Sequence, residues 1–269
     1  MRTILAFAIC GAAAVSVVTN CDRIVGGPPR EIAVAADTSG TKVQITWSPP
    51  SEGTPDRYLV YFSSARDSGY VMLDATGDTT YLHDPEGETG TYRVEAQFGG
   101  ETYRPAGEPS TVPVFTDTVT VSILGGSGNP GFGWNRAGGA GATSPMLDLG
   151  DTVLVDLYVT RYENDSIHIA SPDMAPGDTA GNVPPGEWRE NSFTRALPTG
   201  HDPLPKYNSV EYVGFRPVAD TSMLPMTVGC WLEDGRFALV RITGVNRFVG
   251  EVRMQSWYQR VTGLRLLYH

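Results

Sequence analysis

A glycine pattern, Gly126-x-Gly128-x-x-Gly131, is the first stretch of this chain that could carry chemistry. The spacing is typical of dinucleotide-binding turns, in which a strand enters the glycines and the N-terminus of a following helix holds the pyrophosphate. A strand is expected before the pattern, but Pro130 and further glycines follow in place of a helix. The segment from Gly125 to Gly141 is therefore predicted to be a surface loop, and no cofactor is expected.

Two aromatic residues of this loop, Phe132 and Trp134, stand between the amides of Asn129 and Asn135. Aromatic planes beside amides suit a sugar, which has both an apolar face and hydroxyl groups. Together with Trp188, which lies further along the chain, Phe132 and Trp134 are the candidate ligand-binding residues. The alternative is that Trp134 packs into the core.

The histidines do not form a metal-binding pattern. None of the four is spaced as His-x-x-x-His or Glu-x-x-His. His168 alternates with Ile167 and Ile169, so it is expected to face solvent or a polar cleft, and His201 falls in a loop of proline and glycine. We predict surface histidines and no metal site; a haem or metal site that uses His168 and His201 is the alternative.

Signatures of catalysis are missing from the sequence. There is no Gly-x-Ser-x-Gly nucleophile elbow and no Asp-x-Asp-x-Asp calcium loop. Acidic pairs such as Glu187 with Glu190 and Asp148 with Asp151 fall in expected loops. No catalytic residue is predicted, and the protein is not expected to be an enzyme.

Composition indicates a β protein that carries a net negative charge. The 269 residues include 31 glycines and 20 prolines, and 41% are hydrophobic. Many turns together with a sizeable core favour strands over helix bundles, in one or two domains. The net charge of −10 argues against nucleic acid as the main partner. Arginines gather only near the end, where residues 236–269 hold six of them against the single acid Glu251.

The N-terminus reads as an export signal. After Met1-Arg2-Thr3, the segment from Ile4 to Val18 is apolar but shorter than the roughly 20 residues that a spanning helix needs. Val18-Thr19-Asn20-Cys21 resembles the lipobox of bacterial lipoproteins. The resemblance implies a signal peptide over 1–20, acylation of Cys21 with palmitate-type chains, and a tether over 21–28.

Two alternatives to a lipid anchor at Cys21 stay open. Cleavage could follow the alanine-rich segment 11–14, which would release a soluble secreted or periplasmic protein. Cys21 could also form a disulfide with Cys230, although Cys230 lies in an apolar stretch where a buried free thiol is the usual state. The favoured expectation is an exported lipoprotein held at a membrane of the cell envelope.

Three segments in the first half alternate large and small residues at the period of a strand. They are residues 43–47, 58–62 and 92–96, separated by turn-forming stretches. Trp47 followed by Pro49, the run Tyr58-x-Val60-x-Phe62 and the run Gly90-Thr91-Tyr92-x-Val94-x-Ala96 resemble a fibronectin type III domain over residues 29–115.

The resemblance implies a role for several residues. Trp47 would be the core tryptophan, and Tyr92 would be the corner tyrosine whose hydroxyl bonds to upstream backbone. The segment from Glu108 to Val114 would be the last strand. Glu86 stands where the family often has leucine.

The second half, residues 116–269, is expected to form a β-sandwich or jelly roll. A long irregular passage is expected from Ser171 to Pro205. The terminal hairpin faintly resembles that of secreted haem-scavenging lipoproteins. The expected strands are 117–124, 153–159, 166–170, 210–215, 226–232, 236–243 and 249–259.

The sequence therefore predicts an all-β, non-catalytic lipoprotein of the cell envelope. A fibronectin-like spacer or adhesion module would present a C-terminal β domain that binds a protein or glycan. A carbohydrate-binding or carbohydrate-processing accessory protein, or a haem or metal scavenger, is the alternative.

Overall fold

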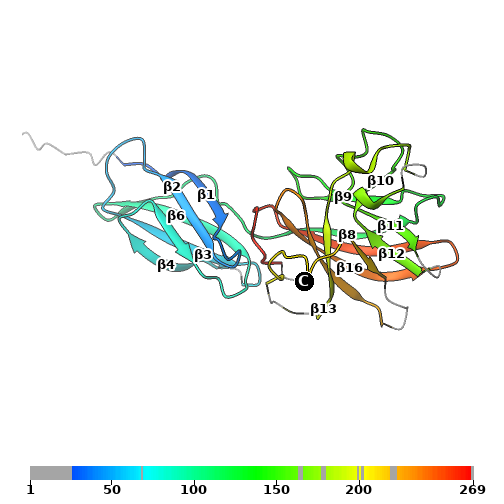
Figure 1. The fold of residues 1–269 in the computed structure, drawn as a ribbon. Coiled ribbons are helices and arrows are strands. Elements are labelled where there is room, and N and C mark those ends of the chain that lie inside the picture. Colours follow the sequence, from blue (N-terminus) through cyan, green and yellow to red (C-terminus); the bar gives the residue numbers. More distant parts are fainter. Residues whose placement is uncertain are drawn as a thin grey trace, which may run out of the picture.

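A computed structural model describes residues 26–67, 69–162, 166–176, 180–198, 200, 203–218 and 223–267. Within them the chain forms two β-sandwiches placed end to end (Figure 1). None of the helices found in these residues is long and apolar enough to cross a membrane. The signal peptide and Cys21 lie outside the described residues.

The first sandwich packs a three-stranded sheet on a four-stranded sheet, in the orders β1-β2-β5 and β4-β3-β6-β7. Every strand pair in it is antiparallel. This arrangement confirms the expected fibronectin type III-like sandwich. The strands are β1 (Arg30–Ala36), β2 (Val43–Ser48), β3 (Arg57–Ser64), β4 (Val71–Thr76), β5 (Thr80–His83), β6 (Gly90–Phe98) and β7 (Glu101–Tyr103).

Strict alternation builds this core. In β6 every second residue from Gly90 to Phe98 is buried, so the strand presents one complete face to the opposite sheet. Trp47 is 5% exposed and meets Tyr58 edge to face, with 5.4 Å between ring centroids. Tyr92 is fully buried, as a corner tyrosine would be.

Two details of the fibronectin-like expectation need correction. The hydroxyl of Tyr92 lies 2.9 Å from Nδ1 of His83, so its partner is a side chain and not upstream backbone. The last strand of the sheet is β7, and residues 109–111 add only short backbone contacts to β6. Val114 already opens β8, which belongs to the second sandwich.

The second sandwich packs two five-stranded sheets, in the orders β10-β9-β11-β12-β14 and β13-β15-β16-β17-β8. Two short helices, η2 (Pro172–Met174) and η3 (Pro185–Glu187), lie between β12 and β13. The strands are β8 (Val114–Ser122), β9 (Gly131–Trp134), β10 (Gly141–Ser144), β11 (Leu157–Tyr162), β12 (Ser166–Ala170), β13 (Ser192–Leu197), β14 (Phe215–Pro217), β15 (Met226–Trp231), β16 (Phe237–Asn246) and β17 (Glu251–Tyr258). The expected sandwich is confirmed.

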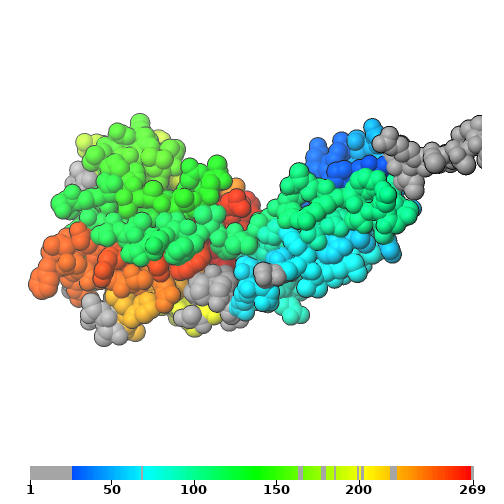
Figure 2. Space-filling model, turned by 180° about the vertical axis from the view of Figure 1, so that it is seen from behind, coloured from blue at the N-terminus to red at the C-terminus, as the bar shows by residue number. Residues whose placement is uncertain are grey.

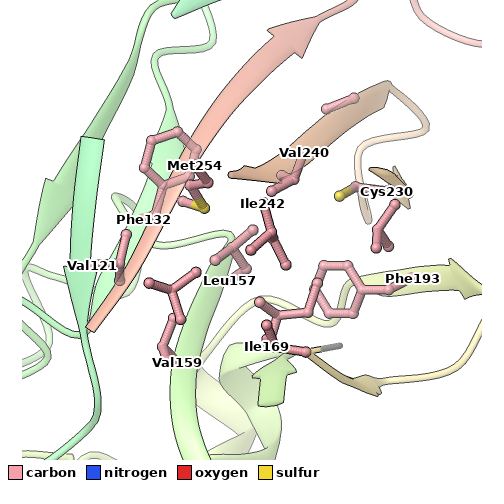
Figure 3. Close-up of a cluster of buried hydrophobic side chains, with 14 of the residues drawn as sticks. Val121, Phe132, Leu157, Val159, Ile169, Phe193, Cys230, Val240, Ile242 and Met254 are labelled. Atoms are coloured by element: carbon pink, nitrogen blue, oxygen red, sulfur yellow. The ribbon is translucent and has the colours of Figure 1, made fainter. Parts of the chain in front are cut away.

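The core of the second sandwich lies between its two sheets. Figure 3 shows Leu157 and Ile169 of one sheet directed toward Ile242 and Met254 of the other. All four side chains are fully buried. This apolar layer is what fixes the relative position of the two sheets.

The prediction of a surface loop holds for residues 125–129, which are exposed and outside any strand, but it is wrong for residues 131–134. Residues 131–134 form β9, all four of which are buried, and β10 pairs with it as a hairpin. A Cβ atom at Gly133 would overlap the backbone carbonyl of Leu154, and one at Gly141 would overlap the ring of Phe132. The glycines therefore allow close packing, because no side chain would fit.

Other boundaries also differ from the expectation. The strand expected over 153–159 begins only at Leu157, because residues 151–154 form a turn. The strand expected over 210–215 is wrong except at Phe215, where β14 begins, because residues 209–211 form a turn. The irregular passage 171–205 contains β13, an edge strand that pairs with β15.

The end of the chain returns to the first sandwich. Leu264 and Leu266 are fully buried within the core cluster that contains Val43 and Tyr92. The backbone N–H of Arg265 donates to the carbonyl of Gly40 at 2.8 Å, and its Nε donates to Ser39 O at 3.0 Å. Figure 2 shows this red segment at the junction of the two lobes. The second sandwich thus completes the core of the first.

Candidate functional site

The three aromatic residues expected to bind a ligand are all in the core. Phe132, Trp134 and Trp188 are 0%, 3% and 4% exposed. Phe132 meets Trp134 edge to face and Tyr258 stacks on it at 5.9 Å, so the indole of Trp134 is covered by other rings. Trp188 belongs to a different core cluster. The three do not form one surface, and none offers an exposed ring face to a sugar.

Beside Trp134 lies a buried ion cluster, whose centre is Asp156. This carboxylate is fully buried and lies 2.6 Å from Arg136 and 2.9 Å from Arg189. It also accepts the backbone N–H of Trp134 at 2.9 Å. Burial lowers the pKa of Arg136, but Asp156 and Asp234 raise it by more, so the net pKa of Arg136 lies above its ordinary value.

The ion cluster connects segments that are far apart in the sequence. Arg136 enters from the end of β9, Arg189 from the passage before β13, and Asp234 from the turn between β15 and β16. Both oxygens of Asp156 are already occupied by donors. A carboxylate whose two oxygens already accept these bonds ties together the three segments that supply the donors and Asp234.

A second arrangement, here called the aromatic pocket, lies on the outer side of β11 and β12. Tyr162, His168 and Phe215 meet one another with ring centroids 5.5 to 5.9 Å apart. They border a hollow of about 110 Å³, together with Tyr158 and Met174. Tyr162 is 53% and Phe215 is 38% exposed, so these two rings offer free surface at the rim.

Polar groups line the same hollow. The Nδ1 of His168 lies 3.0 Å from the carbonyl oxygen of Ser166. Because a carbonyl only accepts, Nδ1 carries the hydrogen and the other ring nitrogen, Nε2, remains for a ligand. Burial, followed by the charge of Asp173, raises the pKa of Tyr158 to about 12, so its hydroxyl stays protonated and can donate.

The aromatic pocket is too small for haem. A volume of about 110 Å³ lies below the 300–1,000 Å³ typical of drug-sized ligands, so it accepts one ring and not a porphyrin. No group of three or more metal-binding side chains occurs among the described residues. His201 lies outside those residues. His168 is 7% exposed and faces the pocket instead of bulk solvent.

Cys230 is a free thiol, buried completely in the core of the second sandwich. Burial, followed by the charge of Asp156, raises the pKa of this thiol. It is therefore an inert packing residue.

The sequence pointed to only part of the aromatic pocket. The alternation of Ile167, His168 and Ile169 indicated a histidine on a polar face. Tyr162 and Phe215 were missed, because they come from β11 and β14, which are neighbours of β12 only in the folded sheet.

Comparison with known proteins finds only distant structural matches. No family model matches the chain, and no curated protein matches it. Among solved structures, an Fn3-like protein from Clostridium thermocellum is 20% identical over 32% of this chain and 90% of its own, with a TM-score of 0.29. The chicken CNTN1 FN1–FN3 domains are 12% identical over 88% of this chain and 89% of their own, with a TM-score of 0.24. At TM-scores this low, the matches add nothing to the strand order described above.

Proposed function

We propose that this protein is a non-catalytic binding protein of the cell envelope, and that its C-terminal sandwich binds a carbohydrate ring in the aromatic pocket. The observation that carries the proposal is the meeting of the half-exposed rings of Tyr162 and Phe215 over a hollow that also holds His168. Such a site combines an apolar platform with a few convergent polar groups, which is the usual composition of a small-ligand pocket.

The chemistry of the pocket suits a sugar better than a purely apolar ring. The faces of Tyr162 and Phe215 can cover the C–H side of a pyranose. The hydroxyl of Tyr158 can donate to a sugar oxygen, and Nε2 of His168 can accept from a sugar hydroxyl. The proposal keeps the ligand class suggested by the sequence but moves the site away from Phe132, Trp134 and Trp188.

The arrangement of the two sandwiches supports display of this pocket. β11 and β12 lie on the side of the second sandwich that faces away from the first (Figure 1). A lipid anchor at Cys21 would leave the first sandwich as a spacer between the membrane and the binding domain. The contacts of Arg265 with Ser39 and Gly40 would hold that spacer firmly.

A glycan array with the purified protein tests the carbohydrate proposal. We expect the wild type to bind at least one glycan and Tyr162→Ala to lose that binding. Phe115→Ala is the matched control, because Phe115 is 49% exposed but lies on β8, outside the pocket. Absence of binding by the wild type, or undiminished binding by Tyr162→Ala, would contradict the proposal.

Intact-mass analysis of the membrane fraction tests the anchor separately. We expect the mass of residues 21–269 plus acyl chains. The variant Cys21→Ala should lose the acyl mass and leave the membrane fraction. A soluble wild-type product would remove the anchor from the proposal and leave the carbohydrate site untouched.

A further inference from the structure

A second hollow, here called the seam pocket, opens where the two sheets of the C-terminal sandwich meet at their edges. Its volume is about 260 Å³. β13 is the edge strand of one sheet and β14 is the edge strand of the other. The residues that line the pocket are Arg195, Ala196, Arg216, Pro217, Met226 and Val228.

A bulge in β13 lies beside this pocket. The pairing of β13 with β15 shifts register between Phe193 and Ala196, so Thr194 and Arg195 interrupt the ladder. A bulge turns side chains away from their regular direction. Here Arg195 is exposed, while Val228 of β15 remains at the floor.

The floor is apolar and the rim is cationic. The buried side chains of Met226 and Val228 supply the floor, and Pro217 is exposed. Arg216 is fixed across the seam, because its Nε donates to Phe193 O at 3.1 Å and its Nη2 donates to Glu211 O at 3.0 Å. Burial, followed by the nearby charge of Arg195, lowers the pKa of Arg216.

In the part of the chain that the structure describes, the charge of Glu211 acts on Arg216, but no acid forms an ion pair with either guanidinium group. Neither Arg195 nor Arg216 forms an ion pair there, although the chain carries a net charge of −10. Among the described residues, the hydrogen bonds of the Arg216 side chain go to two backbone carbonyls. Two like charges beside a low-dielectric floor repel each other, and an anion between them would relieve that repulsion.

We propose that the seam pocket binds a small amphipathic carboxylate, with its hydrocarbon chain over Met226 and Val228 and its carboxylate between Arg195 and Arg216. A guanidinium group matches a carboxylate in geometry as well as in charge. The volume admits a short chain and excludes a large lipid. This site is distinct from the aromatic pocket, and the two proposals do not depend on each other.

Isothermal titration of the intact protein with octanoate tests the proposal. We expect saturable binding of one octanoate, and weaker binding of hexanoate by roughly fifteenfold, since each buried methylene contributes about a fourfold gain in affinity. Octyltrimethylammonium carries an alkyl chain of similar length with a positive charge and should not bind. Equal affinity for octanoate and octyltrimethylammonium, or no octanoate binding at millimolar concentration, would overturn the proposal.

Three variants locate the site. Arg195→Gln should weaken octanoate binding by about tenfold or more, because it removes a charged partner at an exposed position. Ala196→Leu should block binding by filling the hollow from its rim. Arg241→Gln is the control, because Arg241 lies on β16 outside the seam pocket. Octanoate binding that survives both of the first two variants would place the ligand elsewhere and refute the assignment.

Discussion

The two sandwiches use the same architecture but reach it in different ways. The first relies on strict alternation, so that β2 and β6 each bury one complete face and β3 buries Tyr58 and Val60. The second contains β9, a strand whose four residues are all buried and include two glycines, and it holds the charged side chain of Asp156 in its interior. Strands with alternating polar and apolar residues can form a core wherever they pair. The second sandwich depends in addition on the close packing of β9 against the backbone of Leu154 and on the ion pairs of Asp156.

The two sandwiches also differ in regularity, and the more regular one does not have a complete core of its own. The first sandwich has the more regular pattern, yet Leu264 and Leu266 from the end of the chain belong to its core. A regular pattern therefore does not make it an independent unit. Four experiments can break or sharpen this comparison.

The largest effect is expected from Asp156→Ala. The change leaves Arg136 and Arg189 in a buried site without their common anion, and a broken buried pair costs about 3–5 kcal/mol. Urea denaturation should show the loss. Lys42→Ala is the control, since Lys42 pairs with Asp84 at the surface, where a pair contributes about 0–1 kcal/mol. Equal losses for both variants would contradict the special role of the buried cluster.

Leu266→Ala should destabilise the first sandwich, although the residue lies near the C-terminus. Truncating a fully buried leucine costs about 2–5 kcal/mol. Hydrogen exchange read by mass spectrometry should show faster exchange in β2 and β6. Leu82→Ala, at a position that is 49% exposed, should leave exchange unchanged. If Leu266→Ala speeds exchange only in the second sandwich, the first is self-contained.

Gly133→Ala should cost about 1–3 kcal/mol, because the added methyl group overlaps the carbonyl of Leu154 and β9 must move. The matched change Gly77→Ala introduces a methyl group into open space in the first sandwich. Thermal unfolding of the two variants measures the contrast. If Gly133→Ala leaves the unfolding temperature unchanged, β9 tolerates displacement, and one difference between the sandwiches is removed.

The smallest effect concerns pH and His83. Burial lowers the pKa of His83, with Asp84 opposing the shift, so the folded state releases the proton more readily than the unfolded state. The unfolded chain therefore gains a proton first as the pH falls below 6.5, and the free energy of unfolding decreases from there down to the folded-state pKa. Above pH 6.5 this effect is absent.

The variant His83→Gln should flatten that part of the pH profile. Denaturant titrations between pH 7.5 and about 5 would measure it. A variant profile with the same slope as the wild type would assign the acid sensitivity to other groups.

The alternation of residue types along the sequence was enough to predict most of the strands. The alternation around Trp47, Val60 and Val94 predicted three strands that the structure confirms, and the long terminal hairpin was visible in the same way. Prolines and glycines marked the turns between them. The candidate site was far less predictable, because Tyr162 and Phe215 are 53 residues apart and meet only across β12.

What the sequence by itself determined is therefore the all-β class, which its composition indicates, and most strand positions, which rest on the side-chain period of a single strand. The fibronectin-like sandwich followed from a resemblance of motifs. Only the tertiary structure decided that the glycine-rich segment contains the buried strand β9 and that Trp134 is covered by Phe132 and Tyr258. It also decided that the chain end completes the first core. These features depend on contacts between segments distant in sequence, which no local period encodes.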